Sequence, residues 1–181
     1  MTTRRTAALA AAALALAAGA VAAVLPGAAD AGAAASAATP TRAERAALVA
    51  MRQEEKLARD VYRTLSERWG VRIFATIARS EQRHMDAIGG LLARYGIPDP
   101  VAGLARGDFA DPSLDVLYDQ LVAQGATSFR AAAGVGVRIE RLDLADLRRQ
   151  LTRVDRPDIV RVLQHLSRGS QHHLAAFERL A

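Results

Sequence analysis

The 181-residue chain contains no cysteine. This absence excludes a disulfide framework, a thiolate zinc site, an iron–sulfur cluster and a cysteine nucleophile. Any bound metal must therefore be held by oxygen and nitrogen ligands. Lysine is nearly absent too, since Lys56 is the only lysine among 24 basic residues. The arginines are interspersed with acids, which is typical of a solvated helix surface, so we expect no nucleic-acid partner.

Alanine is concentrated at the beginning of the chain, with 20 alanines in the first 40 residues and 21 in the remaining 141. An apolar run from Ala7 to Leu25 follows Arg4 and Arg5, and Ala29-Asp30-Ala31 provides a small-residue cleavage site. This order of basic residues, apolar run and cleavage site is typical of a secretory signal peptide.

We therefore predict a signal peptide at residues 1–31 and a flexible lead-in at 32–40, with one folded domain at 41–181. Export by the general secretory route and export by the twin-arginine route both remain open, because a pair of arginines precedes the run. The mature protein would be secreted or held in the cell envelope, with no membrane segment after cleavage. The less favoured alternative is an uncleaved N-terminal anchor.

The rest of the sequence predicts helices. Thr41 and Glu44 form a capping box, which marks a helix start. Apolar residues then recur at alternating spacings of three and four, as on one buried helix face. The predicted long helices cover about 41–69, 72–95, 127–152 and 157–180.

The connections between these helices are short, long and short. The long connection carries a short helix at 112–124 and can run the length of the bundle. We therefore predict an all-α domain, a four-helix bundle with one long crossover, which is the ferritin-like topology.

Polar side chains interrupt the apolar face of every long helix near its middle. Charged groups in a core are costly unless they are paired or bind metal. The interrupting residues are Glu55, Glu81, His84, Glu140, Asp143 and His173. The four carboxylates carry a charge of −4, which two divalent cations would balance. Oxygen and imidazole ligands favour iron, with manganese or zinc as alternatives.

Several short motifs resemble known proteins. They are Glu54-Glu55-Lys56-Leu57-Ala58-Arg59-Asp60-Val61-Tyr62, Ser80-Glu81-Gln82-Arg83-His84-Met85, Leu117-Tyr118-Asp119, and Gly169-Ser170 followed by His173-Leu174. Together they resemble the ferritin-like superfamily, most closely rubrerythrin-type di-iron carboxylate proteins. More narrowly, they are similar to an uncharacterised exported ferritin-like family known by a domain-of-unknown-function label. The resemblance covers about residues 44–180.

The resemblance implies a role for each candidate ligand. Glu55 would be the first-helix ligand, Glu81 would bridge two metals and His84 would bind one of them. Glu140 would be the third-helix carboxylate, and His173 the fourth-helix imidazole.

Three further positions qualify this assignment. Asp143 would be an additional carboxylate, with capping or an arginine partner as its alternative role. Tyr62 would lie beside the site, either as a radical or proton donor or as a core residue with a satisfied hydroxyl. One position departs from the pattern, because Ser170 stands where a glutamate is expected. This loss would weaken one metal site, open a coordination position or leave a single metal.

The resulting functional expectation is an exported di-metal oxidoreductase of the ferroxidase or peroxidase type. Its substrates would be dioxygen or hydrogen peroxide, with an external electron donor. Two alternatives remain: a non-catalytic metal-binding bundle and a metal-free structural or interaction bundle. We expect a monomer or a homodimer.

Overall fold

The computed structural model describes residues 39–181, and this part of the chain contains helices and no strand. The helices are α1 (Arg42–Trp69), α2 (Arg72–Arg94), α3 (Pro112–Gly125), α4 (Phe129–Leu151) and α5 (Pro157–Glu178). The predicted all-α class is confirmed, and each boundary lies within two residues of the expected one. The predicted signal peptide at 1–31, with nearly all of the lead-in, lies outside the described residues. Among the described helices, none combines the length and apolar character that a membrane span requires.

The helix ends follow from local side-chain chemistry. The Thr41 side chain accepts a hydrogen bond from the Glu44 amide, and the Glu44 carboxylate accepts one from the Thr41 amide. The other Glu44 oxygen accepts hydrogen bonds from the amides of Asp155 and Arg156, so the cap of α1 also fixes the turn before α5. Gly70 ends α1 with a φ of 65°, a left-handed conformation that favours glycine.

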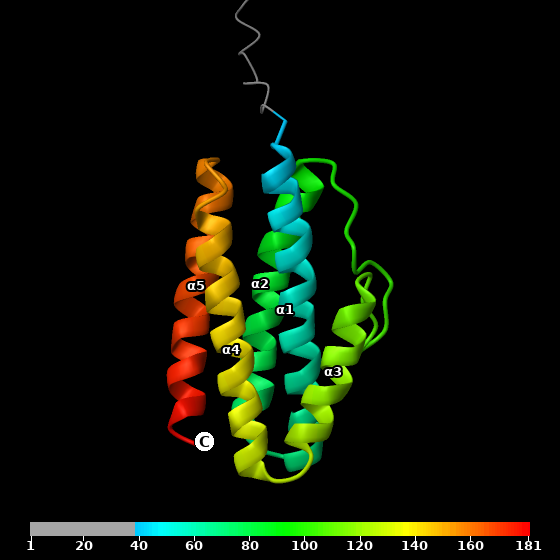
Figure 1. Ribbon diagram of the computed structural model, residues 1–181, viewed down its shortest axis with the longest axis vertical. Coiled ribbons are helices and arrows are strands. Elements are labelled where there is room, and N and C mark those ends of the chain that lie inside the picture. Colours follow the sequence, from blue (N-terminus) through cyan, green and yellow to red (C-terminus); the bar gives the residue numbers. More distant parts are fainter. Residues whose placement is uncertain (1–38) are drawn as a thin grey trace, which may run out of the picture. The chain divides into compact units, whose positions relative to one another are not determined.

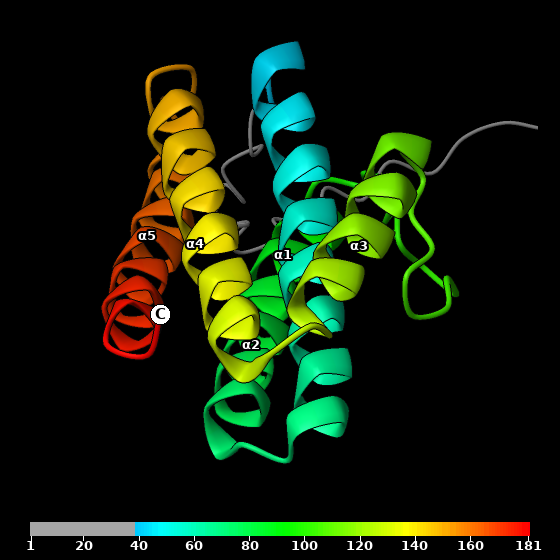
Figure 2. The ribbon, with the colours of Figure 1, turned by 60° about the horizontal axis from the view of Figure 1, so that its bottom comes forward.

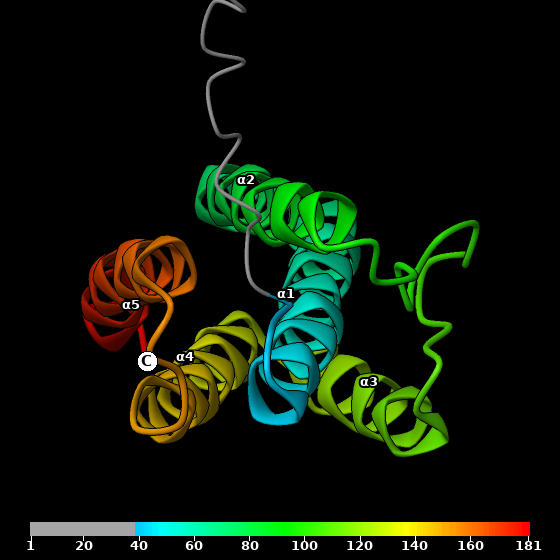
Figure 3. The same cartoon turned by 90° about the horizontal axis from the view of Figure 1, so that it is seen from above.

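The four long helices form two antiparallel hairpins (Figure 1). Helix α1 packs closely against α2, and α4 packs closely against α5, while the two hairpins contact each other less extensively. Seen from above, the α1–α2 pair and the α4–α5 pair face each other across a seam (Figure 3). The short helix α3 contacts α1 and α4, and it lies on the far side of α1 from α5 (Figure 2).

A buried ion pair attaches the crossover to α1. The Lys56 ammonium lies 2.6 Å from an Asp60 carboxylate oxygen and 2.6 Å from the Ala105 carbonyl oxygen, to both of which it donates. Its Nζ also lies 4.5 Å from the centroid of the Phe109 ring. The Gly107 amide donates to Asp60 as well. These contacts hold the long connection against α1, and Figure 1 shows this connection running from the end of α2 to α3.

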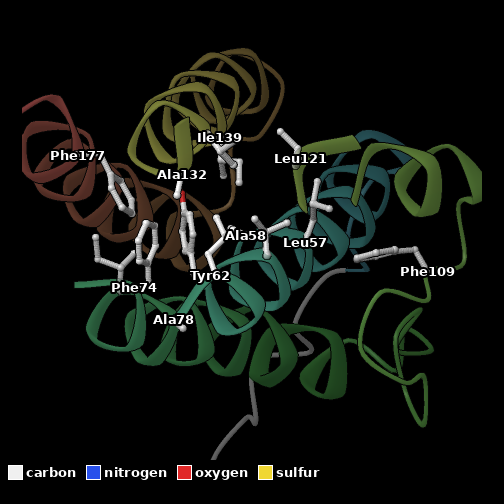
Figure 4. Close-up of a cluster of buried hydrophobic side chains, with 14 residues drawn as sticks. Leu57, Ala58, Tyr62, Phe74, Ala78, Phe109, Leu121, Ala132, Ile139 and Phe177 are labelled. Carbon is white, nitrogen blue, oxygen red and sulfur yellow. The ribbon is translucent and has the colours of Figure 1, made fainter. Parts of the chain in front are cut away.

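Two apolar clusters fill the bundle on either side of a polar layer. The first cluster includes Tyr62, Phe74 and Phe177, and Figure 4 shows these rings grouped between α1, α2 and α5. The second includes Leu48 and Ile88. The layer between them contains the buried acids and histidines predicted as metal ligands. The apolar clusters therefore exclude water above and below this layer.

Candidate metal centre

Five of the predicted ligands are buried in one layer of the bundle. Each is at most 8% exposed: Glu55 on α1, Glu81 and His84 on α2, Glu140 on α4, and His173 on α5. The spacing of three between Glu81 and His84 places both on the same face of α2. The layer lies on the seam between the two hairpins, so both hairpins contribute ligands.

Glu81 connects the two histidines. Its Oε2 lies 2.8 Å from the His84 Nδ1, and its Oε1 lies 2.8 Å from the His173 Nδ1. The two imidazole rings have centroids 5.6 Å apart. A carboxylate whose two oxygens face two different imidazoles has the arrangement of a bridging ligand.

Each half of the layer has one further carboxylate. Glu55 Oε2 lies 3.2 Å from His84 Nδ1, and Glu140 Oε2 lies 3.7 Å from His173 Nδ1. The donor atoms form two groups, Glu55–Glu81–His84 and Glu81–Glu140–His173, and the atoms of each group lie within 4.8 Å of one another. The two groups share Glu81.

The separations between these donor atoms, and the hydrogen bonds that they lack, match ligands around a metal ion better than a set of hydrogen-bonded side chains. Ligand atoms about 2.1 Å from one ion lie roughly 3 Å apart, close to the separations in both groups. Several of them also lack a hydrogen-bond partner within residues 39–181, namely Glu55 Oε1, Glu81 Oε1 and His173 Nδ1. His173 Nδ1 is close to Glu81 but does not have hydrogen-bond geometry. Buried polar atoms without partners are costly, and bound cations would satisfy them.

The pKa values of the histidines and Glu81 reflect their contact. Burial lowers the pKa of His84, but hydrogen bonds and charge from Glu55 and Glu81 outweigh it and raise this pKa to about 10. Burial likewise lowers the pKa of His173, yet Glu140 and Glu81 raise it to about 9. Burial would raise the pKa of Glu81, but His173 and His84 bring it down to about 2.

The other acids of the layer hold protons more strongly. Burial raises the pKa of Glu140 to about 7, with the Glu81 charge adding to the rise while His173 and Tyr62 oppose it. Burial and the charge of Asp143 raise the pKa of Glu55 well above its usual range. In the absence of metal, protons therefore replace part of the positive charge that two cations would supply.

Asp143 is not brought into either group of donor atoms. Its two oxygens are inaccessible to solvent and have no hydrogen-bond partner in the described chain. Burial raises its pKa well above its usual range. The nearby Ser170 side chain opposes this rise in the pKa of Asp143. The Ser170 hydroxyl itself donates a hydrogen bond to the Leu166 carbonyl oxygen, 3.1 Å away. Ser170 is buried, as expected at the position of a missing glutamate, and Asp143 lies beside it from the neighbouring helix.

Tyr62 reaches the layer through Glu140. Its hydroxyl donates to Glu140 Oε1 over 2.7 Å, and burial raises the pKa of the phenol well above its usual range. The tyrosine ring packs against Phe74 and Phe177, with centroids 6.4 and 5.1 Å away. Tyr62 therefore lies one hydrogen bond away from the candidate ligand Glu140.

Two glycines shape the site in ways that the sequence pattern does not reveal. A Cβ at Gly169 would lie 2.5 Å from His84 Nε2, so the bare backbone of α5 makes room for that imidazole. A Cβ at Gly136 would lie 2.5 Å from the Phe177 ring. The backbone of α4 at Gly136 therefore packs directly against the Phe177 ring of α5. The sequence feature that could have drawn attention to Gly169 is its position next to Ser170, the residue that stands where a glutamate ligand is expected.

Comparisons with known proteins agree with this fold. The chain matches the family described as an uncharacterized protein domain, DUF2202, over residues 44–181. It is 47% identical over 137 residues to the uncharacterized protein MJ0754 of Methanocaldococcus jannaschii, covering 76% of this chain and 74% of that one. The crystal structure of that hypothetical protein superposes with a TM-score of 0.75, over 77% of this chain and 79% of the other.

A second solved structure shares the fold alone. It is a DUF305 fragment from Deinococcus radiodurans, with 19% identity and a TM-score of 0.55, over 77% of this chain and 95% of the fragment.

Proposed function

Since the chain belongs to the DUF2202 family, we propose its function from the chemistry of the buried layer: it is a di-metal, ferritin-like carboxylate protein of the rubrerythrin type. Iron is the proposed metal, with manganese or zinc as alternatives, because the ligands are carboxylates and imidazoles only. The proposed activity is that of a ferroxidase or peroxidase acting on dioxygen or hydrogen peroxide.

The observation that supports this proposal most strongly is the position of Glu81. One carboxylate oxygen faces His84 and the other faces His173, each at 2.8 Å. Glu55 and Glu140 complete the two sides. Paired carboxylates and imidazoles from facing helices are the ligand set of di-iron carboxylate bundles.

The protein's own residues hold, orient and shield the reacting groups. Tyr62 keeps Glu140 oriented through its hydroxyl, and the raised pKa of the phenol keeps it protonated as a hydrogen-bond donor. Phe74 and Phe177 cover Tyr62 and exclude water from that side. When bound, a pair of iron ions supplies redox chemistry toward dioxygen or peroxide, with ferrous iron or another external donor as the electron source.

The test compares turnover in protein loaded with ferrous iron. The parent should consume peroxide or dioxygen faster than a Glu81→Ala variant. Glu178→Ala is the matched control, because that glutamate is exposed on α5 and pairs with Arg141; it should behave as the parent does. Equal rates in the parent and Glu81→Ala would refute the catalytic proposal.

Tyr62→Phe separates the role of the phenol from that of the ligands. We expect this variant to bind metal as the parent does and to turn over more slowly, because Glu140 loses its hydrogen-bond donor. Unchanged turnover would assign Tyr62 to packing alone.

A second candidate function is metal binding without catalysis. Ser170 favours it, because a glutamate there would have been a further ligand and the serine hydroxyl instead donates to Leu166. Tight binding of about one ion without redox turnover would select this function.

We also propose that the protein is exported, from the signal-like order of residues 1–31. A fusion of residues 1–40 to a reporter that is active only outside the cytoplasm should give activity. A fusion with Arg4 and Arg5 replaced by lysine distinguishes the routes, since the twin-arginine pathway requires the pair. An inactive reporter in the unaltered fusion would contradict export.

A further inference from the structure

A pocket of about 200 Å³ lies between α1, α3 and α4, outside the two groups of donor atoms. Leu57, Leu121 and Ile139 form its buried wall, and Figure 4 shows these three side chains grouped between the three helices. Leu114 and Leu117 on α3 are half-buried, and Leu142 on α4 is 46% exposed. The pocket therefore has an apolar wall that extends from the core to the surface.

Its remaining lining is acidic. Glu54, Asp143 and Asp146 line the same pocket, and none of the described basic side chains does. Asp146 forms an ion pair with Arg149. Glu54 Oε2 and both Asp143 oxygens each expose less than 1 Å² and have no hydrogen-bond partner within residues 39–181. These buried carboxylate oxygens present acceptors beside an apolar cavity, which is costly unless a donor occupies it.

We propose that this pocket binds a small organic cation, an amine with a compact apolar body and an ammonium head. The body would pack against the leucines, and the ammonium would donate to Glu54 and Asp143. A neutral hydroxyl would donate more weakly to these unpartnered oxygens than an ammonium group does, and an anion would offer them no donor. A metal ion fits less well, because these acids do not join any third donor in a group within 4.8 Å, and the wall is apolar. The volume is below the range for drug-sized ligands, so the ligand is small.

This inference goes beyond the proposed oxidoreductase function and does not depend on it. Glu54 belongs to neither metal group, so a change at Glu54 alters the pocket and leaves the metal ligands in place. Success or failure of amine binding can therefore be separated from success or failure of metal binding.

The test is isothermal titration with three probes of the same carbon skeleton: 3-methylbutylamine, 3-methylbutan-1-ol and 3-methylbutanoate. The amine should bind saturably at one site, the alcohol about tenfold more weakly, and the acid not measurably, because charge-assisted hydrogen bonds are about twice as strong as neutral ones. Glu54→Gln should weaken amine binding about tenfold. The control is Glu67→Gln, an exposed glutamate on the same helix, which should bind as the parent does.

A second variant tests the apolar wall. Leu117→Trp places a larger side chain at the half-buried mouth of the pocket and should abolish amine binding. The far-ultraviolet circular dichroism spectrum should remain that of a helical protein. Equal affinity for amine and alcohol, or unchanged amine affinity in Glu54→Gln, would overturn the proposal. If Leu117→Trp unfolds, the Glu54→Gln comparison decides alone.

Discussion

The substitution Gly169→Ala tests whether the space above His84 is needed for metal binding. A Cβ at residue 169 would lie 2.5 Å from His84 Nε2 and 2.7 Å from Cε1. Carbon atoms in ordinary contact are about 3.5–4.0 Å apart, so the imidazole must withdraw by about 1 Å. Metal–ligand distances tolerate only about 0.2 Å. His84 Nδ1 would then leave its place beside Glu81 and Glu55.

The magnitude follows from comparable changes around metal ligands. Mutation of groups that orient a ligand costs about 10–100-fold in metal affinity. At saturating metal, a 100-fold loss removes about 2.7 kcal/mol of stabilisation, which for a domain of this size is roughly 5–10 °C of metal-induced shift in Tm. Without metal, the higher helix propensity of alanine stabilises the fold by about 1 kcal/mol relative to glycine, and the crowding of the added Cβ against His84 offsets this gain.

The assay is thermal unfolding with and without added metal. Gly134→Ala is the matched control, because residue 134 is also helical and its added Cβ would meet no described atom within 4 Å. The control should gain stability and keep the full metal-induced shift. If Gly169→Ala keeps the full shift too, His84 is not a ligand in the position described here.

Three further predictions concern charge in the core. Lys56→Met should destabilise the fold by about 1–3 kcal/mol in urea unfolding, because Asp60 loses its ammonium partner and keeps the Arg59 guanidinium, 2.7 Å away, as its charged contact. Lys56→Met combined with Asp60→Asn should cost less, because the carboxylate charge is then removed together with the ammonium; a double variant no more stable than the single one would refute this reading. In metal-free protein, the pKa values of His84 and His173 are raised to about 10 and 9. Both histidines therefore bind protons more tightly in the folded state than in the unfolded state. Their stabilisation is complete below their unfolded pKa and is lost as pH rises through 9 and 10, so the metal-free Tm should fall across that range. Metal binding must displace those protons, so metal affinity should weaken as pH falls from 8 to 6; a pH-independent affinity would contradict the site.

The fold could be predicted from the sequence because each long helix has a regular apolar face and clear ends. Thr41, Gly70 and Pro157 mark boundaries by local chemistry, which needs no knowledge of the rest of the chain. The polar positions within those faces, such as Glu81 and His84, also follow from spacing alone. That these side chains meet in one layer was predicted because the apolar face of each of the four long helices is interrupted by polar residues near its middle.

Contacts between distant segments could not be predicted in the same way. Lys56 and Asp60 look like a solvated pair four residues apart, and only the crossover, through Ala105 and Gly107, buries them. Gly169 is significant only because α5 approaches α2 at His84. Asp143 shares a helix face with Glu140, yet it does not join either group of donor atoms, because its position depends on how α4 packs against α1 and α5.

The most direct test of the central claim is the metal content of natively purified protein. Elemental analysis of the parent should find two divalent ions per chain, iron foremost, and Glu81→Ala should lose both because Glu81 belongs to both groups. One ion per chain would support the single-site alternative that Ser170 suggests. No bound ion, together with no rise in Tm on adding iron, manganese or zinc, would contradict the account.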